Sequence, residues 1–291
     1  MTEPPDDRSD TVLCPTRGPA AWKHGAAALL TALILCGPCI SAAAVPGTLD
    51  VGDFSAARPG GQLPPGWRPL RFPGIGKHTR YTLVQNGGQV VIRAQADASA
   101  SGLVREVHID PRVYPVLRWR WKITGVLAGT SLSRKDGDDA MARLYITFAY
   151  DPARLGPIDR LRYEAARLVY GSAPPLRALT YLWTGAGRIG AWAPNPSTDR
   201  VMMQVLETGG SRVGQWVTEE RNLYQDYRRA FGEDPPMISG VAIMTDTDNT
   251  GGRTVSYYGD IRFEKPDAVR PTQTRSNAPA TMIEAGDQRT P

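Results

Sequence analysis

The stretch that indicates the fold most directly is Val116-Leu-Arg-Trp-Arg-Trp-Lys-Ile123. Apolar and basic residues alternate along it. The apolar set is Leu117, Trp119, Trp121 and Ile123, and the basic set is Arg118, Arg120 and Lys122. Because successive side chains of a strand point to opposite faces of a sheet, this period predicts a β-strand with one face in the core and one basic face.

The chain on both sides of this strand reads mostly as further short strands separated by Gly and Pro turns. Asn86-Gly-Gly88 is a hairpin signal, and Leu144, Ile146, Phe148 and Tyr150 form another apolar face. Besides 116–123 we expect strands at 80–84, 89–94, 103–109, 141–150, 179–183, 201–207, 213–217 and 254–263, with an apolar run at 240–244.

Two helices interrupt the strands. Residues 158–170 carry an apolar stripe that stops at Gly171, and residues 222–231 open with the capping-box pattern Asn222-x-x-Gln225 and stop at Gly232. The predicted fold is therefore mainly β: an antiparallel β-sandwich of jelly-roll type with two inserted helices.

The N-terminal segment has the pattern of an export signal. An apolar run at 25–40 follows Lys23-His24 and precedes Ser41-Ala-Ala-Ala44, so we expect residues 1–44 to be an export signal and leader that is cleaved after Ala44. The protein would then be periplasmic or extracellular, and an uncleaved N-terminal membrane anchor is the alternative. Residues 45–264 are expected to form a single domain, and residues 265–291, rich in Pro, Thr and Ala, a disordered tail.

Composition excludes several kinds of chemistry. The three cysteines, Cys14, Cys36 and Cys39, all lie in the leader, so we expect no disulfide, no thiol nucleophile and no redox cofactor in the mature domain. The net charge of +5 is spread over dispersed arginines in an exported chain, which argues against nucleic acid as a partner. Nucleotide-binding and serine-hydrolase motifs do not occur in the sequence.

Oxygen-bearing side chains gather at Met244-Thr-Asp-Thr-Asp-Asn-Thr-Gly-Gly252, which we expect to be a loop at the mouth of a β-hairpin. It begins like an EF-hand loop, but Tyr257 stands where the bidentate Glu would be. A looser Ca²⁺ site with Asp246 and Asp248 as ligands remains open, because Ca²⁺ accepts carboxylates, amides and carbonyls without strict geometry. The alternative is a plain turn, since Asp, Asn and Gly favour turns.

A second acidic cluster, Asp136-Gly-Asp-Asp139, enters the strand at 141–150 and is followed by Arg143. If both acidic loops lie at one end of the sandwich, four carboxylates converge and require a cation, Arg143 or a retained proton to balance them. The alternative for residues 136–139 is a solvated turn. The expected metal ligands are Asp139, Asp246 and Asp248, and the expected ligand-binding residues are Asp138, Asp139, Arg143, Trp183, Trp192 and Asn249. The two tryptophans, which lie in Gly-rich contexts, would form the rim of the site or else seal the sheet.

Five segments resemble an uncharacterised bacterial family known as domain of unknown function 3047. They are Leu117-Arg-Trp-Arg-Trp-Lys122, Asp138-Asp-Ala-Met-Ala-Arg143, Arg228-Arg-Ala-Phe-Gly-Glu-Asp-Pro-Pro236, Ile243-Met-Thr-Asp-Thr-Asp-Asn-Thr250 and Tyr258-Gly-Asp-Ile261. The resemblance implies an exported β-rich protein and carries no catalytic residues. The order of motifs also resembles galactose-binding-like sandwiches, in which a terminal strand ends near a structural calcium.

The functional hypothesis is an exported binding protein for a polar ligand, a glycan, with Ca²⁺ as its candidate cofactor. One alternative is a carbohydrate-active hydrolase that uses Asp139 with Asp246 or Glu220 as paired carboxylates. The other is an envelope assembly protein whose basic face, formed by Arg118, Arg120 and Lys122, meets an anionic surface; solvated surface charge is the simpler explanation of that face.

Overall fold

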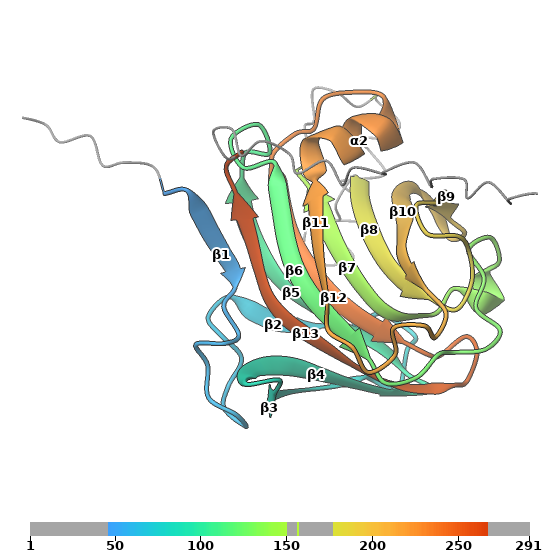
Figure 1. Cartoon of the computed structure of the whole chain (residues 1–291). Coiled ribbons are helices and arrows are strands. Elements are labelled where there is room, and N and C mark those ends of the chain that lie inside the picture. Colours follow the sequence, from blue (N-terminus) through green and yellow to red (C-terminus); the bar gives the residue numbers. More distant parts are fainter. Residues whose placement is uncertain (1–45, 150–155, 157–176, 267–291) are drawn as a thin grey trace, which may run out of the picture. The chain divides into compact units, whose positions relative to one another are not determined.

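The computed structural model describes residues 46–149, 156 and 177–266 (Figure 1). The expected leader at 1–44, the expected helix at 158–170 and nearly all of the expected tail lie outside these residues. Within the described part of the chain, no helix combines the length and the apolar character needed to cross a membrane.

Two β-sheets make up the fold, as the sequence predicted. Sheet A runs in the order β11-β6-β13-β4-β3, with β1 paired to β13, and sheet B runs in the order β2-β5-β12-β7-β8-β10-β9. The strands of sheet A are β1 (Thr48–Gly52), β3 (Arg80–Asn86), β4 (Gln89–Asp97), β6 (Val116–Ile123), β11 (Val217–Asn222) and β13 (Arg253–Glu264). Those of sheet B are β2 (Trp67–Leu70), β5 (Ala100–Ile109), β7 (Ala140–Phe148), β8 (Arg177–Thr184), β9 (Trp192–Asn195), β10 (Thr198–Thr208) and β12 (Ile238–Asp246).

The chain repeatedly changes sheets. It crosses from one to the other on leaving β1, β2, β4, β5, β6, β10, β11 and β12, so that strands adjacent in the sequence often face each other across the core. Among the described strands every pairing is antiparallel except that of β8 with β10. The antiparallel β-sandwich is therefore confirmed, with one parallel pair that the sequence did not reveal.

Aromatic side chains fill the space between the sheets. The predicted alternation of β6 is confirmed, since Leu117, Trp119, Trp121 and Ile123 are all buried. The ring of Trp119 lies 5.3 Å from that of Tyr181 on β8, and the ring of Trp121 lies 6.2 Å from that of Trp183 on the same strand. Tilted and edge contacts of this kind add to the gain from burying the rings, so β6 and β8 form the centre of the core.

One α-helix occurs among the described residues, α2 (Leu223–Phe231), and it confirms the second of the two expected helices. The side chain of Asn222 accepts a hydrogen bond from the backbone N–H of Gln225 at 3.0 Å, which caps the N-terminus as predicted. Gly232 ends the helix in the left-handed conformation with φ of 73°.

The Asn86-Gly-Gly88 signal is also confirmed. Asn86 pairs with Gln89 across the turn between β3 and β4, and Gly87 and Gly88 both have positive φ, as a tight type I′-like turn requires.

Some of the strand boundaries predicted from sequence were wrong. The expected strand at 213–217 is mostly turn, and β11 begins only at Val217. Strands β1, β2 and β9, each of four or five residues, were missed because such short segments show too little alternation.

Replacing Trp183 by Ala should destabilise the domain severely, because the side chain is fully buried and packs on Trp121. We expect the free energy of unfolding in urea to fall by about 3–5 kcal/mol, the usual cost of a large-to-small change in a core. Ile189→Ala, at a position 58% exposed, serves as the control and should change stability by less than about 0.5 kcal/mol. A tolerated Trp183→Ala variant would contradict the burial of this ring.

Candidate functional site

Three crossings between the sheets meet at one rim of the sandwich. They are the corner between β4 and β5 at 98–99, the loop between β6 and β7 at 124–139, and the loop between β12 and β13 at 247–252. The backbone N–H of Ala98 donates to the carbonyl of Gly252 at 2.9 Å, and that of Thr247 donates to the carbonyl of Ser99 at 3.0 Å. The loop at 247–252 is thus not a hairpin mouth, as expected from sequence, but a bridge from sheet B to sheet A.

Strand pairing brings the two acidic segments together. The first residue of β7, Ala140, pairs with the last residue of β12, Asp246. The loop before β7 holds the short 3-10 helix η1 (Lys135–Gly137) and ends at Asp138 and Asp139. The convergence that the sequence left as a hypothesis is present in the structure.

Arg143 occupies the centre of the cluster and is only 2% exposed. Its Nε and Nη2 donate to the two carboxylate oxygens of Asp246 at 2.9 and 3.0 Å, in a bidentate ion pair. Nη2 also donates to the carbonyl and to the carboxylate of Asp138 at 2.7 and 2.9 Å. Burial disfavours the guanidinium charge, yet the combined attraction of Asp246, Tyr145 and Asp138 outweighs this and raises the pKa of Arg143 well above its ordinary value.

Asp139 organises the bridging loop. One of its carboxylate oxygens accepts hydrogen bonds from the backbone and side-chain nitrogens of Asn249, at 3.3 and 3.1 Å. The other accepts from the backbone N–H and the hydroxyl of Thr250, at 2.7 and 2.6 Å. A buried carboxylate with four donors is well satisfied, so Asp139 locks the bridging loop onto the strand entry.

Asp248 is the carboxylate that remains uncommitted. No other residue in the described part of the chain donates a hydrogen bond to it, and it is less buried than its neighbours. One oxygen from each of Asp139, Asp246 and Asp248 lies within 4.8 Å of the others, a spacing compatible with a common cation. All three side chains offer hard oxygen ligands, the type that Ca²⁺ and Mg²⁺ prefer.

Charge in the cluster is unbalanced. Four carboxylates, those of Asp138, Asp139, Asp246 and Asp248, face the single guanidinium of Arg143. Burial raises the pKa of Asp246 to about 7, against the opposing attraction of Arg143, and the nearby Asp139 and Asp138 add to the rise. Burial and then Asp139 raise the pKa of Asp248 as well. The arrangement would be relieved by an added proton or by a bound cation.

The structure brings the expected acidic residues together, but it does not place the two expected tryptophans at the acidic cluster. Trp183 is fully buried and donates from Nε1 to the carbonyl of Gly209 at 3.4 Å, so its assignment to an exposed rim was wrong, and its role is the core seal named as the alternative. Trp192 is partly exposed, packs against the core and lies 5.9 Å below the guanidinium of Arg229. The residue of β9 that does reach the cluster is Asn195, which donates to Asp138 at 2.9 Å and was not predicted.

The paired acids of the hydrolase hypothesis are poorly placed for catalysis. Asp139 and Asp246 are buried and hydrogen-bonded to protein groups, so neither presents a free carboxyl to a substrate. Glu220 lies on β11 in the other sheet and pairs with Arg118 at 2.8 Å. This arrangement argues against a glycosidase built from these residues.

A second pair of acids faces the interior between β10 and β11. Trp121 donates from Nε1 to Glu219 at 3.2 Å, and the buried Glu207 pairs with Arg212. Burial, and then the nearby charge of Glu207, raise the pKa of Glu219 to about 7. The sequence could have indicated Glu219 through its place, two residues after Val217, on the inward face of β11.

Comparison with known proteins identifies the family. The fold and the rim define a mainly β, two-sheet sandwich with an acidic crossing between its sheets. The chain belongs to the family described as protein of unknown function (DUF3047), whose model matches residues 65–262. No curated protein matches the sequence.

Several solved structures show a distant likeness. The carbohydrate recognition domain of Emp47p has a TM-score of 0.39 at 12% identity, covering 75% of this chain and 95% of that one. The xyloglucanase domain of NopAA from Sinorhizobium fredii has a TM-score of 0.37 at 8% identity, and the match covers 75% of this chain and 98% of that one. A family 30 carbohydrate-binding module from Clostridium thermocellum has a TM-score of 0.31 at 14% identity, and the match covers 75% of this chain and 99% of that one. At these identities and TM-scores, nothing about ligand or activity follows for this chain.

Replacing Arg143 by Met should cost about 3–5 kcal/mol of unfolding free energy in urea, because it leaves the carboxylate of Asp246 buried without its counter-charge. The double variant Arg143→Met/Asp246→Leu, which removes both charges, should recover part of that loss. If Arg143→Met costs less than about 1 kcal/mol, as exposed pairs do, the pair does not organise the rim.

Glu219 should make stability depend on pH. Its pKa is raised from 4.5 to about 7 in the folded protein, so the folded state holds a proton that the unfolded state has released. The free energy of unfolding should therefore fall as pH rises from about 4.5 to 7, by about 1–2 kcal/mol after allowance for partial exposure. Urea titrations of Glu219→Gln should lack this decline, whereas those of its exposed neighbour Glu220→Gln should keep it. Parallel curves for wild type and Glu219→Gln would show that Glu219 titrates normally.

Proposed function

We propose that this chain is an exported binding protein for a glycan, and that Ca²⁺ at Asp139, Asp246 and Asp248 holds the rim in its binding form. The observation that carries the proposal is the meeting of these three carboxylates within 4.8 Å, with a single arginine beside them. Export rests on the signal-like pattern of residues 1–44.

Two features favour a cation over a proton as the balancing charge. Asp248 has no competing donor from another described residue, so its carboxylate is available to a metal without breaking existing contacts. The cluster also joins the end of β12 to the entry of β7, and a divalent ion there would add a link between the two loops. Oxygen ligands without sulfur or histidine suit Ca²⁺ better than zinc or copper.

The glycan part of the proposal follows from the same coordination. Ca²⁺ takes roughly six to eight oxygen ligands, more than three partly engaged carboxylates supply. Asn249 is exposed beside the cluster, with its amide nitrogen 3.1 Å from Asp139. Neighbouring hydroxyls of a sugar could complete the coordination of the ion and bond to the exposed amide, whereas an apolar ligand would find no match there.

Adding Ca²⁺ should raise the melting temperature, because an ion that binds only the folded state stabilises it by an amount that grows with the logarithm of its concentration relative to Kd. At about one hundred times its Kd the gain is about 2.7 kcal/mol, which corresponds to a rise of roughly 5–10 °C for a domain of this size. EDTA should abolish the rise, as followed by thermal denaturation.

The variant Asp248→Asn tests the site with least risk to folding, since its carboxylate is not bonded to another described residue. It should keep the melting temperature of the metal-free protein and lose the Ca²⁺ response. Asp136→Asn is the matched control, because this exposed aspartate lies on η1 of the same rim and, among the residues that the structure describes, forms an ion pair only with Arg134, at 3.3 Å. Absence of any Ca²⁺ shift in the wild type would refute the metal site.

A further inference from the structure

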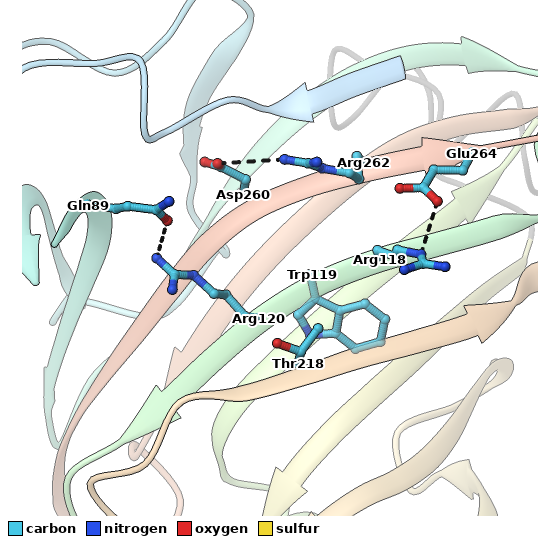
Figure 2. Close-up of a pocket in the computed structure, with 8 residues that line it drawn as sticks. All are labelled: Gln89, Arg118, Trp119, Arg120, Thr218, Asp260, Arg262 and Glu264. Carbon is cyan, nitrogen blue, oxygen red and sulfur yellow. Dashed lines mark hydrogen bonds and ion pairs between the residues drawn. The ribbon is translucent and has the colours of Figure 1, made fainter. Parts of the chain in front are cut away.

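We infer a second binding site, on the outer face of sheet A, for a carboxylate-bearing glycan such as a polyuronate. It is formed by Arg120 and Lys122 of β6 and by the pocket beside Arg120 (Figure 2). The site shares only its ligand class with the rim described above and needs no metal.

Arg120 is held flat against the sheet. Its guanidinium lies 4.4 Å from the centre of the Trp216 ring, and Nη2 donates to the side-chain carbonyl of Gln89. The side chain crosses β13 at Gly259, where an added Cβ would lie 2.6 Å from Cγ of Arg120. Among the described residues no carboxylate forms an ion pair with it, so its charge is fixed in position and not neutralised.

Lys122 lies two residues further along the same face. Its ammonium donates to the side-chain oxygen of Asn86 and sits 5.1 Å from the Trp216 ring and 4.7 Å from the Tyr257 ring. Burial, and then repulsion by Arg120, lower the pKa of Lys122. Here too the described part of the chain provides no ion-pair partner. Two adjacent cations without acidic partners therefore lie over the ring of Trp216.

Two other arginines that line the pocket or flank it are already paired with carboxylates. Arg118 contacts Glu220 at 2.8 Å and Glu264 at 3.0 Å. Arg262 lies between Asp50, at 3.6 Å, and Asp260, at 3.9 Å. Of the basic face expected on β6 from sequence, the pair Arg120 and Lys122 therefore keeps its charge available to an anion.

A pocket opens beside Arg120. Its volume of about 340 Å³ is at the lower end of the range for small-ligand pockets, ~300–1,000 Å³. Figure 2 shows the guanidinium of Arg120 turned toward Gln89, with Asp260 and Arg262 on one side and Thr218 on the other. The lining residues are Gln89, Arg118, Trp119, Arg120, Thr218, Asp260, Arg262 and Glu264.

This mixture of groups selects among anions. A membrane surface or a polyphosphate presents dense negative charge, which would meet Glu220, Asp260 and Glu264 at close range and be repelled. A uronic acid carries one carboxylate per ring with hydroxyls around it. Its carboxylate fits the pair of cations, while the hydroxyls can donate to the carboxylates and accept from Gln89 and Thr218.

The experiment measures binding of polygalacturonate by calorimetry in EDTA, with neutral galactan, polyphosphate and phosphatidylglycerol vesicles as comparisons. Polygalacturonate should bind, and its affinity should fall as salt rises. Arg120→Gln and Lys122→Gln should each weaken binding by about tenfold or more, the effect of losing one charge-assisted contact. Arg68→Gln is the matched control: it removes the same charge from β2 of the other sheet, where Arg68 pairs with Glu106 at 2.6 Å, and should bind like the wild type.

Three results would overturn the inference: no binding of polygalacturonate, equal binding by the Arg120→Gln and Lys122→Gln variants, or tighter binding of polyphosphate or vesicles. Melting temperatures of the variants distinguish lost binding from lost folding, and Lys122→Gln disturbs fewer packed atoms than Arg120→Gln. Because EDTA is present, failure here leaves the Ca²⁺ response of the rim untouched, and absence of that response leaves this site untouched.

Discussion

The buried ion pair of Arg143 and Asp246 is the interaction on which the rim depends. Asp246 ends a strand of sheet B just before the chain crosses to sheet A, so its position controls where the crossing begins. The guanidinium also holds Asp138, and Asp139 in turn holds the backbone of the bridging loop. Removing water from a carboxylate is unfavourable unless an opposite charge is supplied. Asp139 and Asp246 are both buried, and one arginine serves them together with the partly exposed Asp138 and Asp248. The stability of this rim and the cation binding proposed for it therefore have the same electrostatic origin.

The two proposed sites have opposite electrostatic character. At the rim, carboxylates outnumber cations; on the outer face of sheet A, Arg120 and Lys122 lie side by side without acidic partners among the described residues. The β-sandwich accounts for this separation, because alternate residues of β6 serve different surroundings: Trp119 and Trp121 fill the core while the residues between them face outward. One strand thus contributes both to the packing of the domain and to the site proposed on the outer face of sheet A.

Much of the fold was predictable from sequence, and part of the site was. Alternation identified β6, and the Asn222 cap identified α2, because both signals are local. The sheet exchange after Asp246 was not predictable, since a loop that turns back within one sheet and a loop that bridges two sheets use the same turn residues. Convergence of the acidic segments depended on the pairing of β7 with β12, which joins distant parts of the chain. Trp183 was expected at the rim because glycines follow it in the sequence, whereas its side chain is fully buried near the end of β8.

The repeated exchange between sheets has a consequence for how the domain folds. Strand β5 finds its partner β12 more than a hundred residues later, and β13 pairs with β1, β4 and β6. Few contacts can then form early from neighbouring segments, and a chain dominated by long-range pairing folds slowly. Until the last strand arrives, the inner surfaces of both sheets remain open to water and to other chains. The domain is therefore expected to fold as one cooperative unit, with no half that is stable alone.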